Sequence, residues 1–132
     1  MERKKDLVAE WLSKADDDLA LAESALDRAA PICWAAAFHA QQAAEKCLKA
    51  LLTWHEIEYG KTHDIGYLLD LCAQVNSAIE SSCPEAAALT DYAVEPRYPL
   101  PARDATEGEA RRAIRIAHQV RQAVRAALGL AT

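Results

Sequence analysis

The hydrophobic positions of this chain recur every three or four residues over long stretches, which is the spacing of one face of a helix. Four amphipathic helices are predicted in this way, over about residues 5–29, 32–57, 62–79 and 106–128. A shorter helix is expected at residues 85–94, where Pro96 ends it. Long helices joined by tight turns predict an all-α protein, an up-and-down antiparallel four-helix bundle with an additional short helix.

The stretch from residue 32 to residue 57 is expected to be the central helix of the bundle. One side is apolar, and much of it is small: Ala36, Ala40, Ala43, Ala44, Cys47, Leu48, Leu51 and Trp54. The other side is a narrow polar strip of Gln42, Glu45, Lys46 and Lys49, interrupted by Trp34, Phe38 and Leu52. A helix that is apolar on most sides is contacted by several neighbours, and its small residues let another helix approach closely.

Turn residues predict where the helices begin and end. Gly60 suits the positive φ of a helix stop, and Thr62 is expected to cap the third helix. Thr106 and Glu109 have the spacing of a capping box before the last helix. The irregular stretch at 94–105 contains prolines that exclude a helix, and a loop of this length in a bundle is more often functional or mobile than filler.

The composition limits the class of protein. The 132 residues are enough for one domain over 1–132, and 52% are hydrophobic but only 6% aromatic, as in an all-helical chain. The formal net charge of −5 gives no general attraction to nucleic acid, so any phosphate-binding surface must be local. The four cysteines lack the spacing of a zinc or redox motif and are expected to be free, buried thiols. No signal-peptide core or membrane-spanning run is found, which predicts a cytoplasmic protein without membrane contact.

Several charged residues have alternative interpretations. Asp18 lies on the edge of the apolar stripe of the first helix, so it is either a boundary carboxylate in water or a partly buried acid paired with a base on the central helix. Glu45 and Lys49 have the favourable i, i+4 spacing of an ion pair, on a strip that is either solvated surface or part of a groove or subunit interface. His39 and His63 are lone histidines, expected to be structural or exposed, and no metal site or cofactor is predicted.

The last helix has a basic face. It carries five arginines, most of them on the solvent side with His118: Arg111, Arg112, Arg115, Arg121 and Arg125. They form either a solvated face that suits the negative end of the helix dipole or a local phosphate-binding stripe. No Gly-rich phosphate loop, Ser-His-Asp set or Cys-His pair accompanies them.

Four landmarks of the sequence resemble those of the HEPN family, in the family's order. They are the segments 15–19 (ADDDL), 38–52 (FHAQQAAEKCLKALL), 61–64 (KTHD) and 97–99 (RYP). The resemblance spans nearly the whole chain and implies an up-and-down helical bundle, commonly a homodimer. It also implies kinship with the helical module that accompanies small nucleotidyltransferases, fused to them or encoded beside them as in toxin–antitoxin pairs. Nucleotide binding is implied too, and some members are metal-independent ribonucleases.

The ribonuclease members use an Arg and a His that lie a few residues apart, and this signature is incomplete here. Arg97 resembles the family's arginine by position, but no His follows it in the loop. Arg112 and His118 match literally, yet on a continuous helix their side chains point about 120° apart. Arg111 and His118 lie roughly 10 Å apart along the axis. Neither pair converges readily on one phosphate within a single chain, although a dimer brings in residues of its partner.

The sequence therefore predicts a non-catalytic HEPN protein that binds a nucleotide, a small nucleotidyltransferase partner, or both. Arg97 is expected to contact phosphate, because a guanidinium fork matches phosphate geometry, and Tyr98 to stack on a base or pack beside it. The other residues of the expected site are Lys46 and Lys49 for charge, His63 for a hydrogen bond, and Gln42 and Glu45. The alternatives are a ribonuclease toxin that cleaves RNA with Arg97 and His118, and a structural dimerisation module.

Overall fold

The structure, a computed structural model, describes residues 2–93 and 104–131, and every regular element in them is a helix. The elements are α1 (Glu2–Leu26), α2 (Cys33–Trp54), α3 (Ile65–Ala73), α4 (Ile79–Ser82), the 3₁₀ helix η1 (Ala86–Tyr92) and α5 (Glu107–Ala127). The prediction of an all-α protein is therefore confirmed. Arg97, Tyr98 and most of the proline-containing stretch lie outside the described residues.

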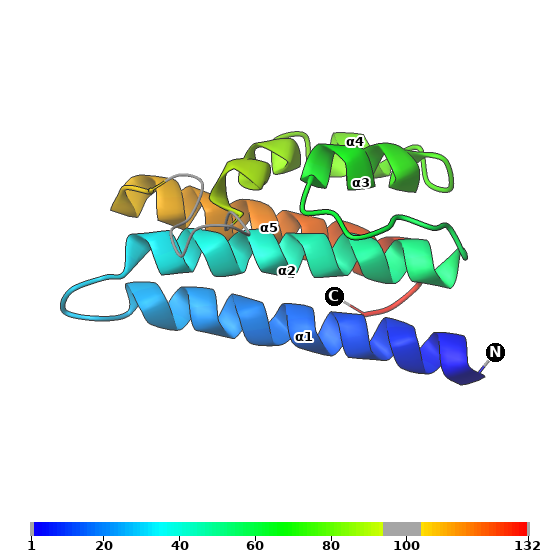
Figure 1. The fold of residues 1–132 in the computed structure, drawn as a ribbon, viewed down its shortest axis with the longest axis horizontal. Coiled ribbons are helices and arrows are strands. Elements are labelled where there is room, and N and C mark those ends of the chain that lie inside the picture. Colours follow the sequence, from blue (N-terminus) through cyan, green and yellow to red (C-terminus); the bar gives the residue numbers. More distant parts are fainter. Residues whose placement is uncertain (1, 94–103, 132) are drawn as a thin grey trace.

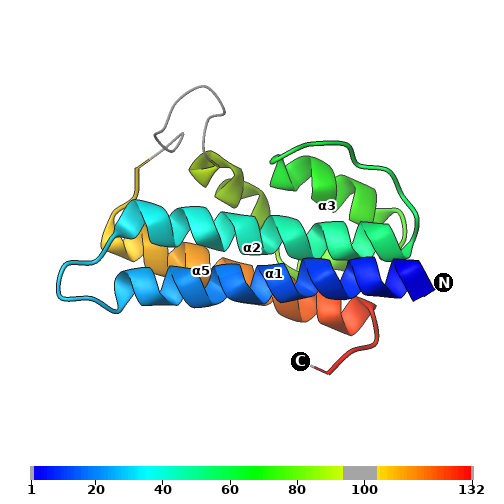
Figure 2. The ribbon, with the colours of Figure 1, turned by 60° about the horizontal axis from the view of Figure 1, so that its bottom comes forward.

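Helix α2 occupies the middle of the molecule, with α1 along one side and α5 along another (Figure 1). Helices α3, α4 and η1 form a shorter layer on the side of α2 that faces away from α1. Both ribbon views show that α1 runs opposite to α2, whereas α5 runs in the same direction as α2 (Figures 1 and 2). The predicted central position of α2 is thus confirmed.

The prediction of a long third helix is wrong. Helix α3 ends at Ala73, and Val75, expected in its buried stripe, is 38% exposed. The Asn76 side chain accepts a hydrogen bond from the backbone N–H of Ala78, a local turn that competes with the helix. Ile79 is nevertheless buried, so the hydrophobic period continues across a break in the backbone. The described part of the chain has three long helices, and the four-helix topology is not confirmed.

Some helix ends agree with the sequence and others do not. Thr106 and Glu109 form the predicted capping box. Gly60 has a positive φ of +65° but is not the helix stop, because α2 ends at Trp54 and the first positive φ after it is that of Glu56, +57°. The cap of α3 is Asp64 rather than Thr62: its carboxylate accepts from the N–H of Tyr67 at 3.1 Å. Helix α1 begins at residue 2 and ends at residue 26, α2 is shorter at both ends than 32–57, and the short helix expected at 85–94 is a 3₁₀ helix.

The core is built where small residues let α1, α5 and the α3–η1 layer approach α2. Its fully buried apolar residues on α2 are Ala36, Ala37, Ala40, Ala43, Ala44, Leu48, Ala50, Leu51 and Leu52. On α1, Ala15 and Ala22 are also fully buried, so both of these helices have small residues in the core. Close packing of this kind makes α2 a rigid support for the polar side chains that project from it.

The four cysteines are free, as predicted. Cys47, Cys72 and Cys83 are buried, whereas Cys33 at the start of α2 is only partly buried. Burial raises the pKa of both Cys47 and Cys72 from 9.0 to about 12, because a thiolate is poorly solvated there. These thiols are therefore packing groups that stay protonated in the folded chain.

Stability is expected to fall between about pH 9 and pH 12. In this range the unfolded chain releases thiol protons that the folded chain keeps at Cys47 and Cys72, so the free energy of unfolding decreases by about 1.4 kcal/mol per pH unit for each thiol. Below pH 9 the folded and the unfolded chain both keep these thiol protons, so the thiols make their full contribution to the free energy of unfolding. Urea unfolding across this range should show a shallower loss in Cys47→Ala than in Cys33→Ala. An equal pH dependence in the two variants would contradict the assignment.

Candidate functional site

Asp18 joins α1 to α2 through two bases. It is only 6% exposed, and one carboxylate oxygen lies 2.9 Å from Nδ1 of His39. The ammonium of Lys46 donates to the other oxygen. A buried carboxylate without a partner is strongly destabilising, and these two bases supply the partner. Of the two interpretations of Asp18, the buried acid paired with the central helix is the one found.

A second polar cluster is centred on Glu45, which is 3% exposed. The ammonium of Lys49 donates to one carboxylate oxygen at 3.0 Å, and Nδ1 of His63 lies 2.7 Å from the other. The side-chain amide of Gln41 donates to that second oxygen and to the backbone carbonyl of His63, at 3.1 Å in both cases. Because a carboxylate accepts hydrogen bonds, Nδ1 of His63 carries its proton and Nε2 is directed elsewhere.

Lys49 is enclosed by aromatic side chains. Its ammonium lies 5.6 Å from the ring centroids of Trp11 and Tyr59, and the residue is 7% exposed. The i, i+4 pair predicted for Glu45 and Lys49 therefore exists, but it is covered by residues of α1 and of the segment after α2. For these two residues the interpretation as a solvated face is wrong.

The expected site residues thus separate into buried and accessible groups. Lys46, with 23% of its side chain exposed, Gln42, which is partly buried, and His63, with 52% of its side chain exposed, reach the surface. Lys49 does not present its charge to solvent. Arg97 lies outside the described residues, but Thr90, near the start of the stretch that carries it, accepts a hydrogen bond from the N–H of Ile65 at 3.0 Å.

The arginines of α5 are largely paired with carboxylates. Arg111 bonds Glu107 at 2.8 Å, Arg112 bonds Glu85 before η1, and Arg121 bonds Asp16 of α1 at 2.8 Å. The Arg112 guanidinium lowers the pKa of Glu85, which keeps that carboxylate ionised. Paired charges favour the interpretation of this face as a solvated helix surface over a phosphate-binding stripe.

Arg112 and His118 face different neighbours. Arg112 reaches Glu85 in the α3–η1 layer, whereas Nε2 of His118 lies 2.7 Å from the carboxylate of Glu23 on α1. The two side chains point in different directions from α5, as helix geometry predicts, and each contacts a different element. Within the described residues of one chain, this literal Arg–His match does not converge on a common point.

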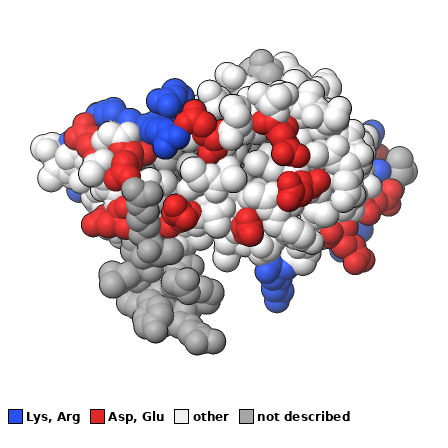
Figure 3. All heavy atoms as spheres, turned by 90° about the horizontal axis from the view of Figure 1, so that it is seen from above, with Lys and Arg blue, Asp and Glu red and all other residues white. Residues whose placement is uncertain are grey.

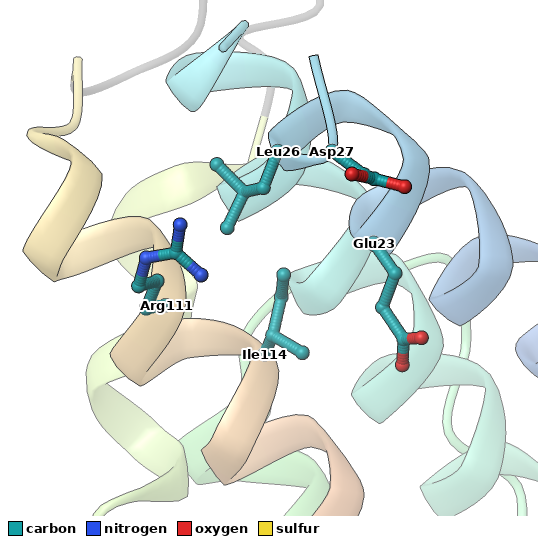
Figure 4. Close-up of a pocket in the computed structure, with 5 residues that line it drawn as sticks. All are labelled: Glu23, Leu26, Asp27, Arg111 and Ile114. Atoms are coloured by element: carbon teal, nitrogen blue, oxygen red, sulfur yellow. The ribbon is translucent and has the colours of Figure 1, made fainter. Parts of the chain in front are cut away.

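A cleft that the sequence analysis did not find lies between the end of α1 and the beginning of α5 (Figure 4). Its volume is about 300 Å³, and it is lined by Glu23, Leu26, Asp27, Arg111 and Ile114. Figure 4 shows the two carboxylates on the α1 side and the guanidinium on the α5 side. The hydrophobic period predicts which residues share a helix face, but it does not predict which face of α5 contacts α1. No local signal in the sequence therefore reveals this cleft.

The layer of α3, α4 and η1 is acidic. Between residues 62 and 93 the sequence has no Lys or Arg, and its acidic residues are Asp64, Asp70, Glu80, Glu85 and Asp91. Seen from above, red side chains are scattered over this layer, while blue side chains gather toward the end where α5 begins (Figure 3). The cations that a polyphosphate needs must therefore come from outside residues 62–93.

Neither a metal-binding cluster nor a membrane-spanning helix is found among the residues that the structure describes. Within residues 2–93 and 104–131, no three His, Cys, Asp or Glu side chains are grouped closely enough to bind a metal ion. No helix in the same ranges combines the length and apolar character needed to cross a bilayer.

Comparison with known proteins gives one match. The family model described as HEPN domain matches residues 8–127, which is most of the chain and includes both polar clusters and the cleft. No curated protein and no solved structure matches the chain. Because the match extends from α1 to the end of α5, the chain belongs to the HEPN domain family.

Proposed function

We propose that this protein is a non-catalytic HEPN domain that acts as a homodimer and binds a nucleotide, a small nucleotidyltransferase partner, or both, as in a toxin–antitoxin pair. The observation that carries the non-catalytic part is the divergence of Arg112 and His118 toward Glu85 and Glu23. Acid–base cleavage of RNA requires both groups within hydrogen-bond reach of the reacting oxygens. Two side chains that point about 120° apart on α5 and are engaged with carboxylates of separate elements do not meet that requirement.

The accessible edge of the polar strip supports the binding part of the proposal. Glu45 binds Nδ1 of His63 and orients the ring, so Nε2 is the nitrogen that would meet a ligand. Lys49 neutralises Glu45 from beneath, and Lys46 and Gln42 lie along the same helix. In this arrangement Lys49 contributes by stabilising Glu45 rather than by contacting phosphate.

Arg97 and Tyr98 would complete this site from the neighbouring loop. Thr90, bonded to Ile65 two residues after His63, is seven residues before Arg97. Thr90 and the two residues after it belong to η1, so the backbone from Ala93 to Arg97 spans at most about 14 Å, which limits the site that Arg97 would join to the surface near the end of η1. Tyr98 follows directly and would stack on a base or pack beside it.

Arg97→Glu is expected to abolish nucleotide-dependent stabilisation. A ligand at one hundred times its dissociation constant raises the free energy of unfolding by about 2.7 kcal/mol, and a carboxylate in place of the guanidinium repels phosphate. A thermal-shift panel of mono-, di- and triphosphates of the four ribonucleosides measures this. Arg28→Glu, a change at an exposed residue just after α1, is the matched control.

Equal shifts in the wild type and Arg97→Glu would contradict the assigned site. No shift with any nucleotide, and no binding of a nucleotidyltransferase, would leave the structural dimerisation module as the correct function.

A ribonuclease remains the second candidate because of one observation. Glu23 bonds His118 and also lines the cleft with Arg111, so the two bases share one side of α5. They are nevertheless separated by about 10 Å along the helix. Glu23 and Asp27 also place negative charge where an RNA phosphate would have to bind. In this second candidate Arg97 and His118 would be the catalytic residues, and a dimer partner would have to bring them together.

A further inference from the structure

An apolar groove lies at the opposite end of α1 from the cleft. It has a volume of about 290 Å³ and is lined by Lys5, Val8, Ala9, Leu12, Trp54, Leu128 and Leu130. Figure 2 shows the chain after α5 passing beside the N-terminal half of α1. The groove thus runs between α1, the last residue of α2 and this C-terminal tail.

The tail is fixed as a wall of the groove. Gly129 has a φ of +74°, and the N–H groups of Gly129 and Leu130 donate to the carbonyls of Ala126 and Arg125 at 3.1 and 2.8 Å. These two bonds are those of a Schellman motif. The Arg125 side chain also donates to the carbonyl of Ala131 at 2.7 Å. Leu130 is therefore held beside the groove while 42% of it stays exposed.

The groove carries a positive charge at one end. Lys5 is its single charged lining residue, and no carboxylate lines it. The neighbouring Lys4 is engaged by the Trp54 ring, 4.5 Å from its centroid, and by Glu56. The positive end of the α1 dipole adds to the charge of Lys5. A complementary occupant has an acidic group at this end and apolar groups along the rest.

The shape of the groove favours a helix as the partner segment that carries these acidic and apolar groups. Lys5, Val8 and Leu12 follow one another at i, i+3 and i+7, a straight line about 10 Å long. Val8 and Leu12, 7% and 8% exposed, form the floor of the groove, and the exposed Leu130 forms a wall, which matches the apolar stripe of another helix. We propose that this groove binds an amphipathic helix of a partner protein, with an acidic side chain of that helix paired with Lys5. The inference concerns a different surface from the nucleotide site and does not depend on it.

The test uses a synthetic helical peptide of about 18 residues, with Leu at i, i+4 and i+7 and Glu at the end of this stripe. Fluorescence anisotropy should show binding to the wild-type chain. Leu130→Ser should weaken binding about tenfold, because one buried leucine contact is lost. Leu7→Ser is the matched control: Leu7 is 45% exposed on the same helix, outside the groove, and its replacement should leave the affinity unchanged.

Charge reversal makes the test specific. Lys5→Glu should weaken binding of the acidic peptide by about fivefold and strengthen binding of a peptide with Lys in place of Glu. Peptide affinities that do not change in Leu130→Ser or Lys5→Glu would overturn the proposal. It would also be overturned if Leu130→Ser converted a dimer to a monomer in light scattering, because a second copy would then occupy the groove, or if decanoate but no peptide bound there.

Discussion

Glu45→Ala is expected to lower the free energy of unfolding by about 3–5 kcal/mol. The change removes the carboxylate that partners the ammonium of Lys49, which is 7% exposed between Trp11 and Tyr59. It also removes the acceptor of Nδ1 of His63. A buried cation without a counter-charge is much less favourable than the pair, so the midpoint of urea unfolding, followed by circular dichroism, should fall steeply.

The chain contains a matched control for this result. Glu10 and Lys14 form the same i, i+4 pair at 3.9 Å on the exposed side of α1, and Glu10→Ala should change stability by about 0.5 kcal/mol or less. Adding Lys49→Met to Glu45→Ala should restore part of the loss, because the unpaired charge is gone. If Glu45→Ala and Glu10→Ala had the same effect, the burial of the Glu45 cluster would be refuted.

Asp18→Ala is expected to produce the second large loss, about 3 kcal/mol. It leaves Lys46 and His39 without their shared carboxylate and opens space between α1 and α2. Asp17→Ala changes the next residue, which is exposed, and should alter stability by about 0.5 kcal/mol or less. Chemical denaturation of the two variants side by side measures the difference. Equal stabilities would contradict the role of Asp18 as the link between these helices.

Much of the fold follows from local signals in the sequence. The hydrophobic period identifies α1, α2 and α5, and the Thr106 capping box marks the start of α5 correctly, whereas α2 ends at Trp54, well before the predicted stop at Gly60. The break after α3 was missed because Ile79 keeps the apolar period, while the turn around Asn76 depends on one side-chain hydrogen bond. A continuous pattern of apolar residues does not require a continuous helix.

The candidate site was less predictable, because its environment comes from residues far apart in the sequence. The edge position of Asp18 left a boundary carboxylate and a paired acid both open, and the structure shows the pair. The spacing of Glu45 and Lys49 indicated an ion pair, but burial by Trp11 and Tyr59 depends on tertiary packing. The cleft likewise exists only because one face of α5 meets the end of α1, which no local pattern specifies.

These contacts divide the residues of the polar strip by role. The Asp18 and Glu45 clusters satisfy buried charges, so Lys49 and much of the strip stabilise the packing of α2. His63 and Lys46 belong to these clusters but are partly exposed to solvent. A nucleotide or protein partner would therefore meet side chains that are already held in place, which reduces the entropy lost on binding.

The most direct test of a non-catalytic function is incubation of the purified protein with single-stranded and structured RNA in the presence of EDTA, with products separated by gel and mass spectrometry. The account predicts that RNA remains intact, equally for the wild type, Arg97→Ala and His118→Ala. Fragments ending in 2′,3′-cyclic phosphate from the wild type, lost in either variant, would show that a histidine and an arginine do meet at one phosphate and would contradict the account.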